Sequence, residues 1–202
     1  AGAREVVGAG PNALVGLILH EPLALPEGER RTVQISFEQP SDGATAFKIH
    51  SHIPETDTWA LHADGRIEPA SASLPETETP ATIRARCADD VPGQALYARL
   101  RELGLTFGSD FRGLQQIWHG PREALGKVSL PETVSGDDNG RYIVHPALLD
   151  ACFHVLGAPF IEESVTHLLV GVDRLQLWDK PGRELLAHAR IHRVEGTAEG
   201  FT

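Results

Sequence analysis

One segment of ten residues, 147–156, constrains the fold of this chain more than any other part of the sequence. Its side chains are all apolar or thiol-bearing except those of Asp150 and His154. Pro146 precedes the segment and is a favourable first residue of a helix, because the N–H that proline lacks would have no partner there. A helix that is apolar nearly all round is usually buried, so the pattern predicts a buried helix from Pro146 to about Leu156.

Asp150 and His154 are four residues apart, which places them on one face of that helix, one turn apart. Burying a carboxylate is costly unless it is paired, hydrogen-bonded or protonated. Asp150 is therefore either a proton donor with a use in catalysis or one half of a structural pair with His154. The spacing alone supports both interpretations equally.

Alternating apolar and polar residues predict antiparallel strands in the first part of the chain. Residues 32–38, 46–50 and 59–63 place apolar side chains at every second position, as half-buried strands do. A more uniformly apolar run at residues 13–19 predicts a further strand. The first eight residues, which end in a glycine, are typical of the end of a helix.

Residues 65–92 break this pattern, because their Pro, Glu, Thr, Ser and Ala are typical of a linker. After them, helical spacing predicts a helix at residues 94–103. We expect further strands at residues 111–119, 123–130, 168–178 and 185–194, and a loop at 131–140. The chain therefore divides into residues 1–64, a linker at 65–92 and a second part at 93–202, with two similar α+β halves.

The composition excludes several classes of function. With 18 basic and 28 acidic residues, the formal net charge is −10, so neither nucleic acid nor an anionic membrane is an expected partner. No apolar run approaches the roughly 20 residues that cross a bilayer, and no signal peptide pattern is present. Two distant cysteines, Cys87 and Cys152, favour free thiols over a disulfide. We expect a soluble, cytoplasmic protein.

Other residues that could carry chemistry give weaker signals. By strand parity, His50 and His52 lie on a polar face, as do His188 and His192, and we expect both pairs to face solvent. No cysteine pair of the zinc type is present, so no metal is expected. Cys152 lies two residues before His154 and would not face it on a helix, which disfavours a Cys–His nucleophile.

Residues 145–154, with the sequence HPALLDACFH, resemble the HPxxxDxxxQ/H signature of polyketide synthase dehydratase domains. Residues 17–37 and 97–114 are also similar to this family and occur in its order, so the resemblance extends over nearly the whole chain. It implies an α+β double-hotdog fold, in which each half wraps a curved antiparallel sheet around a central helix. The first half would lack its N-terminal part.

The resemblance also implies a reaction and roles for individual residues. Members of the family remove water from a 3-hydroxyacyl chain, held as a thioester on the phosphopantetheine arm of an acyl carrier protein, and need no other cofactor. Asp150 would protonate the departing hydroxyl, and His154 would orient Asp150 or the substrate hydroxyl. The residues expected to contact substrate are Phe107, Gly108, His145 and Pro146. His145 is expected to serve mainly at the start of the helix and not as the base.

The sequence departs from the family pattern in two places. The base histidine of the family lies in an HxxxGxxxxP motif, which this sequence does not contain. We therefore expect the chain to be a trimmed piece of a complete domain and to be inactive alone. Phe107 stands where the family usually has the tyrosine of a YGPxF motif, which removes a hydrogen-bonding hydroxyl.

The resemblance implies an acyl carrier protein and neighbouring synthase domains as partners, in a homodimer. Four arginines are candidates for contact with the carrier protein, although solvated surface arginines are the simpler interpretation: Arg99, Arg101, Arg112 and Arg122. Two other functions stay open. The chain could be a non-catalytic scaffold module of a dimeric synthase, or an enzyme that isomerises the double bond or closes a pyran ring on the same fold.

Overall fold

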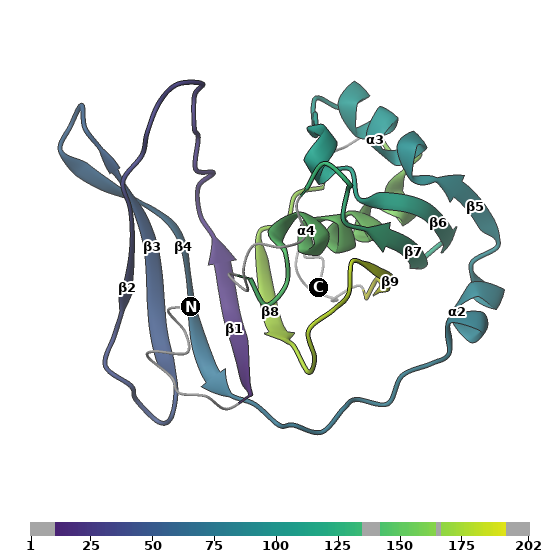
Figure 1. Ribbon diagram of the computed structural model, residues 1–202, viewed down its shortest axis with the longest axis horizontal. Helices are drawn as coiled ribbons and strands as arrows, with labels where there is room; N and C mark the ends of the chain where they lie inside the picture. Colours follow the sequence, from purple (N-terminus) through teal and green to yellow (C-terminus); the bar gives the residue numbers. More distant parts are fainter. Residues whose placement is uncertain (1–10, 135–141, 165–166, 193–202) are drawn as a thin grey trace. The chain divides into compact units, whose positions relative to one another are not determined.

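The computed structural model describes residues 11–134, 142–164 and 167–192, and it divides into two compact units (Figure 1). The first unit comprises Ala1–Leu74 and Leu168–Trp178, and the second comprises Pro75–His167 and Asp179–Thr202. The expected helix end in the first eight residues lies outside the described residues, as does most of the loop at 131–140. No helix in the described part of the chain is long and apolar enough to cross a membrane.

The first unit is a five-stranded antiparallel sheet with the strand order β2-β3-β4-β1-β8. Its strands are β1 (Asn12–Leu19), β2 (Val33–Phe37), β3 (Thr45–Ile53), β4 (Thr58–Pro69) and β8 (Gly171–Gln176). All four strands predicted in the first part of the chain are confirmed. The strand predicted near residues 168–178 also forms, but it pairs with β1 of the first sheet, where Leu14 lies opposite Leu175.

The described residues of the second unit form a four-stranded antiparallel sheet, ordered β5-β6-β7-β9, with three α-helices and two 3-10 helices. Its strands are β5 (Asp89–Pro92), β6 (Leu114–Gly120), β7 (Glu123–Ser129) and β9 (Glu184–Arg190). Its helices are α2 (Pro80–Arg86), α3 (Gly93–Glu102), η1 (Ser109–Phe111), α4 (Pro146–His154) and η2 (Val155–Phe160). The expected α+β class with two antiparallel sheets is confirmed.

Helix α4 forms the centre of the second core. Its buried residues Ala147, Leu148 and Ala151 pack with side chains of α3, β6 and β7, including Leu96 and Ile117. Full burial of a leucine such as Leu148 contributes about 1.5–3 kcal/mol. The helix begins at Pro146, as predicted, and continues beyond His154 as the 3-10 helix η2. The chain tightens there because η2 contains Pro159, whose ring nitrogen has no N–H to donate.

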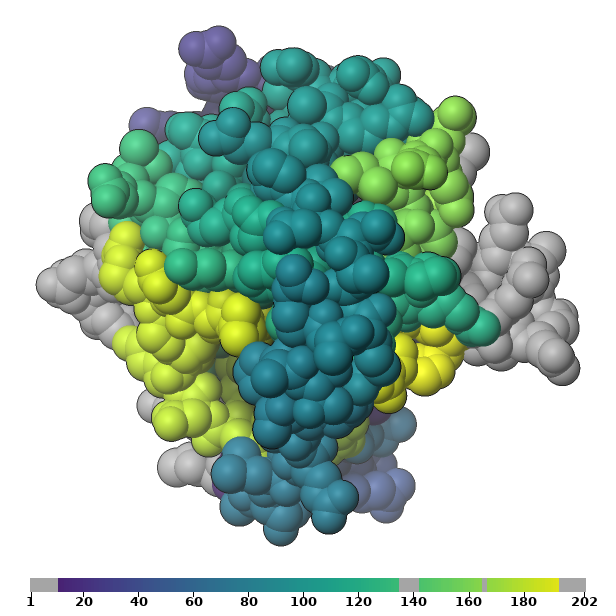
Figure 2. Space-filling model, turned by 90° about the vertical axis from the view of Figure 1, so that its right-hand side faces the viewer, coloured from purple at the N-terminus to yellow at the C-terminus, as the bar shows by residue number. Residues whose placement is uncertain are grey.

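The interpretation of residues 65–92 as a linker differs from the structure. Strand β4 continues to Pro69, and α2 and β5 form beyond it. Thr79 caps α2, since its side-chain oxygen accepts the N–H of Thr82 at 3.2 Å. Proline and threonine are typical of linkers, but in this order they are also typical of the first residues of a helix. Figure 2 shows the blue residues of the later part of this segment, which belongs to the second unit, on the surface beside yellow residues of the same unit.

An exposed network of ion pairs holds α2 to the edge of the second sheet. Arg86 donates to both carboxylate oxygens of Glu123, at 2.6 and 2.8 Å. His188 contacts Glu123 at 2.8 Å, and Arg190 bridges Glu123 and Glu78. The expectation that His188 faces only solvent was therefore wrong, because its strand lies beside the strand that carries Glu123.

The residue Gly126 on β7 allows η2 to approach the sheet closely. A Cβ atom at this position would lie 2.4 Å from Cγ2 of Val155, a stiff side chain in the centre of the core. Gly126→Ala should therefore lower the free energy of unfolding by about 1–3 kcal/mol, measured by urea denaturation. The matched control is Gly157→Ala, because a Cβ there meets nothing closer than 3.9 Å. Equal stability of the two variants would contradict the packing described.

The ion-pair network predicts a pH-dependent contribution to stability. Hydrogen bonds from Arg86, and then from His188 and Arg190, hold the pKa of Glu123 well below its ordinary value of 4.5, against an opposing effect of burial. A depressed carboxyl pKa stabilises the fold above the ordinary value, and this stabilisation is lost as the pH falls through the native pKa. Glu123→Gln should cost about 1 kcal/mol at pH 7, allowing for solvent screening.

Urea denaturation at several pH values checks this prediction. The difference between wild type and Glu123→Gln should shrink as the pH falls below 4.5, the ordinary carboxyl value. Glu184→Gln, at an exposed position of the same sheet, is the matched control and should change stability little. A difference that stays constant down to acid pH would show that the charge of Glu123 contributes nothing.

Candidate active site

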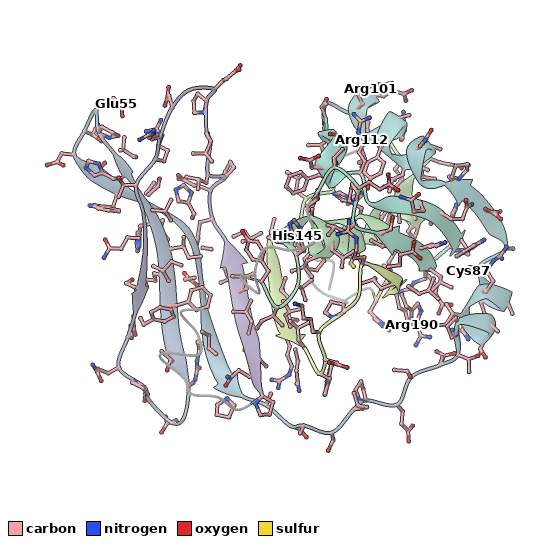
Figure 3. The ribbon with its side chains drawn as sticks, viewed as in Figure 1. Glu55, Cys87, Arg101, Arg112, His145 and Arg190 are labelled. Atoms are coloured by element: carbon pink, nitrogen blue, oxygen red, sulfur yellow. The ribbon has the colours of Figure 1, made fainter. Side chains whose placement is uncertain are left out.

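The start of α4 is fixed by His145. Its Nδ1 accepts the backbone N–H of Ala147 at 3.2 Å, and its carbonyl accepts the N–H groups of Leu148 and Leu149. His145 is thus the N-cap of α4, as expected, and its ring lies 5.5 Å from that of Tyr142. Figure 3 shows His145 at the end of α4 where the helix begins.

Asp150 lies on a face of α4 that is more open than the sequence predicted. Its side chain is 40% exposed, while Leu148 on the opposite side of the helix is buried. Pro146, one turn before Asp150 on the same face, is also exposed. The expectation of a helix buried all round was therefore wrong. The sequence could not separate the open face of α4 from its buried face, because both carry apolar residues. Periodicity does not show which of two apolar faces is covered.

His154 lies beside Asp150 in a more enclosed position. Its Nε2 is 3.2 Å from Oδ2 of Asp150, and its side chain is 10% exposed. On the other side of the ring, Nδ1 lies 3.2 Å from the hydroxyl of Tyr97, and the two rings meet edge to face. The i, i+4 spacing thus brings the two residues together as predicted.

Tyr97 is a residue of this site that the sequence analysis missed. It lies on α3 with 7% of its surface exposed, and its hydroxyl accepts the backbone N–H of Leu114 at 3.1 Å. Burial, together with the negative charge of Asp150, raises the pKa of Tyr97 to about 12, so the phenol is neutral at physiological pH. Its place among the apolar residues of α3 was a signal, since a buried tyrosine hydroxyl needs a hydrogen-bond partner.

Phe107 packs directly against His154. Their ring centroids are 4.4 Å apart at 70°, and Phe107 also lies 5.8 Å from the ring of Tyr97. Arg112 donates to the carbonyl of Phe107 at 2.9 Å and so holds this loop. Gly108, the next residue, is the N-cap of η1. The structure therefore gathers Phe107 and Tyr97 around the ring that contacts Asp150.

Thiol and metal chemistry find little support around α4. Burial raises the pKa of Cys152 to about 11, and its Sγ lies 3.1 Å from the carbonyl oxygen of Leu148, so it does not pair with His154. Within residues 11–134, 142–164 and 167–192, no group of three or more His, Cys, Asp or Glu side chains is arranged to hold a metal ion. What the arrangement offers is a carboxyl group on an open face, supported by an imidazole and a neutral phenol.

Other residues singled out from the sequence lie apart from this group. His52 contacts the exposed side chain of Asp57 at 2.9 Å at the protein surface, and His192 is exposed. Arg99 donates to the carbonyls of Ile161 and Glu163 and therefore joins α3 to the residues after η2.

The four arginines that are close in sequence do not share one role. Arg112 supports the loop of Phe107, and Arg122 lies in the turn between β6 and β7. Arg101 is exposed near the end of α3, where Figure 3 labels it.

Comparison with known families gives a match over most of the second unit. Residues 75–202 match the family model described as the polyketide synthase dehydratase N-terminal domain. Polyketide synthase GfsE of Streptomyces halstedii is 33% identical over 166 residues, which cover 80% of this chain and 4% of that protein. The spectinabilin synthase protein NorA of Streptomyces orinoci is 30% identical over 158 residues, covering 75% of this chain and 8% of that protein.

Solved structures of dehydratase domains share the fold. The dehydratase domain from the CurF module of curacin polyketide synthase has a TM-score of 0.85 and 29% identity, covering 96% of this chain and 70% of that domain. An aspartate-to-asparagine mutant of the CurK dehydratase, described as inactive, has a TM-score of 0.82 and 27% identity, covering 94% of this chain and 68% of the other. The two sheets and helices thus match double-hotdog dehydratases over about 70% of their length.

Proposed function

Because this chain belongs to the polyketide synthase dehydratase family, we propose that its open α4 face supplies the acid that removes water from a 3-hydroxyacyl thioester. Asp150 is that acid. The substrate is carried by the phosphopantetheine arm of an acyl carrier protein within a multidomain synthase, and the product is a 2,3-enoyl thioester. The chain covers less than a tenth of the synthases compared with it, so their other domains are the partners that we propose.

The observation that carries this proposal is the environment of Asp150. Its carboxyl group is accessible on one side and contacts His154 at 3.2 Å on the other. A general acid needs both features, because it must reach the departing oxygen and must be held in position. The inactive aspartate-to-asparagine mutant of the CurK dehydratase shows that an aspartate matters in a related domain.

The proposed elimination of water needs one base, which removes a proton, and one acid, which supplies a proton. A base takes the proton from the carbon next to the thioester carbonyl, and the electrons of that C–H bond form the carbon–carbon double bond. The bond between the β-carbon and its hydroxyl then breaks, and Asp150 protonates the hydroxyl, which leaves as water. The base is a histidine of the family motif HxxxGxxxxP, which is not part of this sequence.

Phe107, Gly108, His145 and Pro146 are proposed to contact the acyl chain. Pro146 shares the open face with Asp150, and Phe107 packs against His154, so both border the acid. His145 is the N-cap of α4, which carries Asp150, and Gly108 is the N-cap of η1, which contacts α4. No cofactor is proposed, since the thioester carbonyl itself makes the α-proton acidic. The synthase is proposed to be a homodimer.

A specific observation favours a second function, that of a non-catalytic scaffold module. Phe107 lies where the family usually has a tyrosine, and its ring centroid is 4.4 Å from that of His154. Loss of the tyrosine hydroxyl removes a hydrogen bond that a substrate could use. The contact between Asp150 and His154 supports the enzyme instead.

Asp150→Asn tests the acid directly. In the full-length synthase, with a 3-hydroxyacyl thioester on the carrier protein, dehydration should fall by about 10²–10⁴-fold, because an amide cannot donate the proton. Asp89→Asn, at an exposed position on β5, is the matched control and should keep the wild-type rate. Wild-type turnover by Asp150→Asn would exclude Asp150 as the donor, and absent dehydration by the wild type would favour the scaffold.

The 202-residue chain alone should give negligible dehydration of a 3-hydroxyacyl thioester, because its sequence holds no HxxxGxxxxP motif. Mass spectrometry of the thioester after prolonged incubation measures this. Addition of the preceding segment of the parent protein, if it encodes the motif, should restore turnover. Substantial turnover by the chain alone would mean that another residue of this sequence is the base.

A further inference from the structure

We propose that Tyr97 is a positioning residue that keeps the proton of His154 on Nε2, and thereby keeps the proton of Asp150 on the oxygen that faces the substrate. This inference rests on the proposed role of Asp150 as the acid. It is carried by a line of contacts that runs from the backbone of β6 through Tyr97 and His154 to Asp150.

The hydroxyl of Tyr97 has only one favourable orientation. Its oxygen already accepts the N–H of Leu114 at 3.1 Å, and the phenol is buried and neutral. A neutral phenol has one proton to donate. Among the described residues, the acceptor within reach of this proton is Nδ1 of His154, at 3.2 Å. Tyr97 therefore donates to Nδ1.

This donation determines the tautomer of His154. A neutral imidazole carries one proton, so a ring that accepts at Nδ1 carries its proton on Nε2. Nε2 faces Oδ2 of Asp150 at 3.2 Å. In the opposite tautomer, Nδ1–H would point at a hydroxyl oxygen that already accepts from Leu114, and the buried proton of Tyr97 would lose its acceptor. The packing of Phe107 against the imidazole restrains the ring from turning over.

The proton on Nε2 in turn decides where Asp150 keeps its own proton. The carbonyl oxygen of a protonated carboxyl group is the better acceptor, so the contact with Nε2–H makes Oδ2 the carbonyl oxygen of a protonated Asp150. The proton then resides on Oδ1, which has no hydrogen-bond partner among the described residues, in a side chain that is 40% exposed. After the proton moves to the departing hydroxyl, Nε2–H stabilises the new carboxylate. With the opposite tautomer, Nε2 would accept the proton of Asp150 and withdraw it from the substrate.

The tautomer can be measured in the full 202-residue chain labelled with ¹⁵N-histidine, by long-range proton–nitrogen correlation spectra. His154→Gln identifies the His154 signals. Asp150→Asn is the informative background, because an asparagine can present either its oxygen or its amide group to Nε2 and so leaves the tautomer to Tyr97. We expect Nε2–H in wild type and in Asp150→Asn, and the appearance of Nδ1–H in Asp150→Asn/Tyr97→Phe.

Tyr142→Phe is the matched control, since Tyr142 is the other tyrosine of the chain and also lies beside a histidine. In the Asp150→Asn background it should leave the His154 signals unchanged. Nδ1–H in wild type, or loss of Nε2–H in Asp150→Asn alone, would overturn the proposal. Because Tyr97→Phe also removes the acceptor for Leu114, backbone spectra must first show that the variant keeps its fold.

Activity gives an independent readout in the full-length synthase. Tyr97→Phe should lower kcat for dehydration by about tenfold, a part of the 10²–10⁴-fold contribution of general acid catalysis, and Tyr142→Phe should not change it. Tyr97→Phe should add nothing to Asp150→Asn. If Tyr97→Phe lowers kcat tenfold in the Asp150→Asn background as well, its role is merely structural and the positioning proposal fails. Wild-type turnover by Asp150→Asn would instead exclude Asp150 as the acid, whereas the tautomer of His154 is measured independently of turnover.

Discussion

The close packing of α4 and η2 against the four-stranded sheet is the constraint on which the site depends. It is possible because two glycines face the helical segment: a Cβ on Gly126 would clash with Val155, and one on Gly113 would lie 2.9 Å from Cβ of Ala151. With α4 held in this way, the face that carries Asp150 turns away from the sheet. The same packing presses His154 against Phe107 and Tyr97, so one core contact sets both the exposure of the acid and the enclosure of its partner.

Local patterns in the sequence predicted most of the secondary structure and the central pair. Period-two alternation located β2, β3 and β4, and Pro146 marked the start of α4 correctly. The i, i+4 spacing of Asp150 and His154 placed them in contact without any knowledge of the tertiary fold. These features follow from interactions within a few residues, which is why the sequence alone reveals them.

Features that depend on distant segments could not be predicted in the same way. The residue pattern of a strand does not show which other strand it pairs with. For this reason β8 was assigned to the second half, although it pairs with β1. Helix α2 is short and has one apolar anchor, Ile83, too little for a helical period to stand out. Tyr97 lies 57 residues from His154 in the sequence, and only the packing of α3 beside α4 brings the two together.

Asp150 is proposed to give its proton to the hydroxyl of a 3-hydroxyacyl chain. The most direct measurement is a crystal structure of the complete domain, without its base histidine, bound to a 3-hydroxyacyl pantetheine. The β-hydroxyl oxygen is expected at about 2.6–3.2 Å from Oδ1 of Asp150, with Nε2 of His154 on the other carboxyl oxygen. A hydroxyl bound to another donor, with Asp150 turned toward solvent, would exclude Asp150 as the acid.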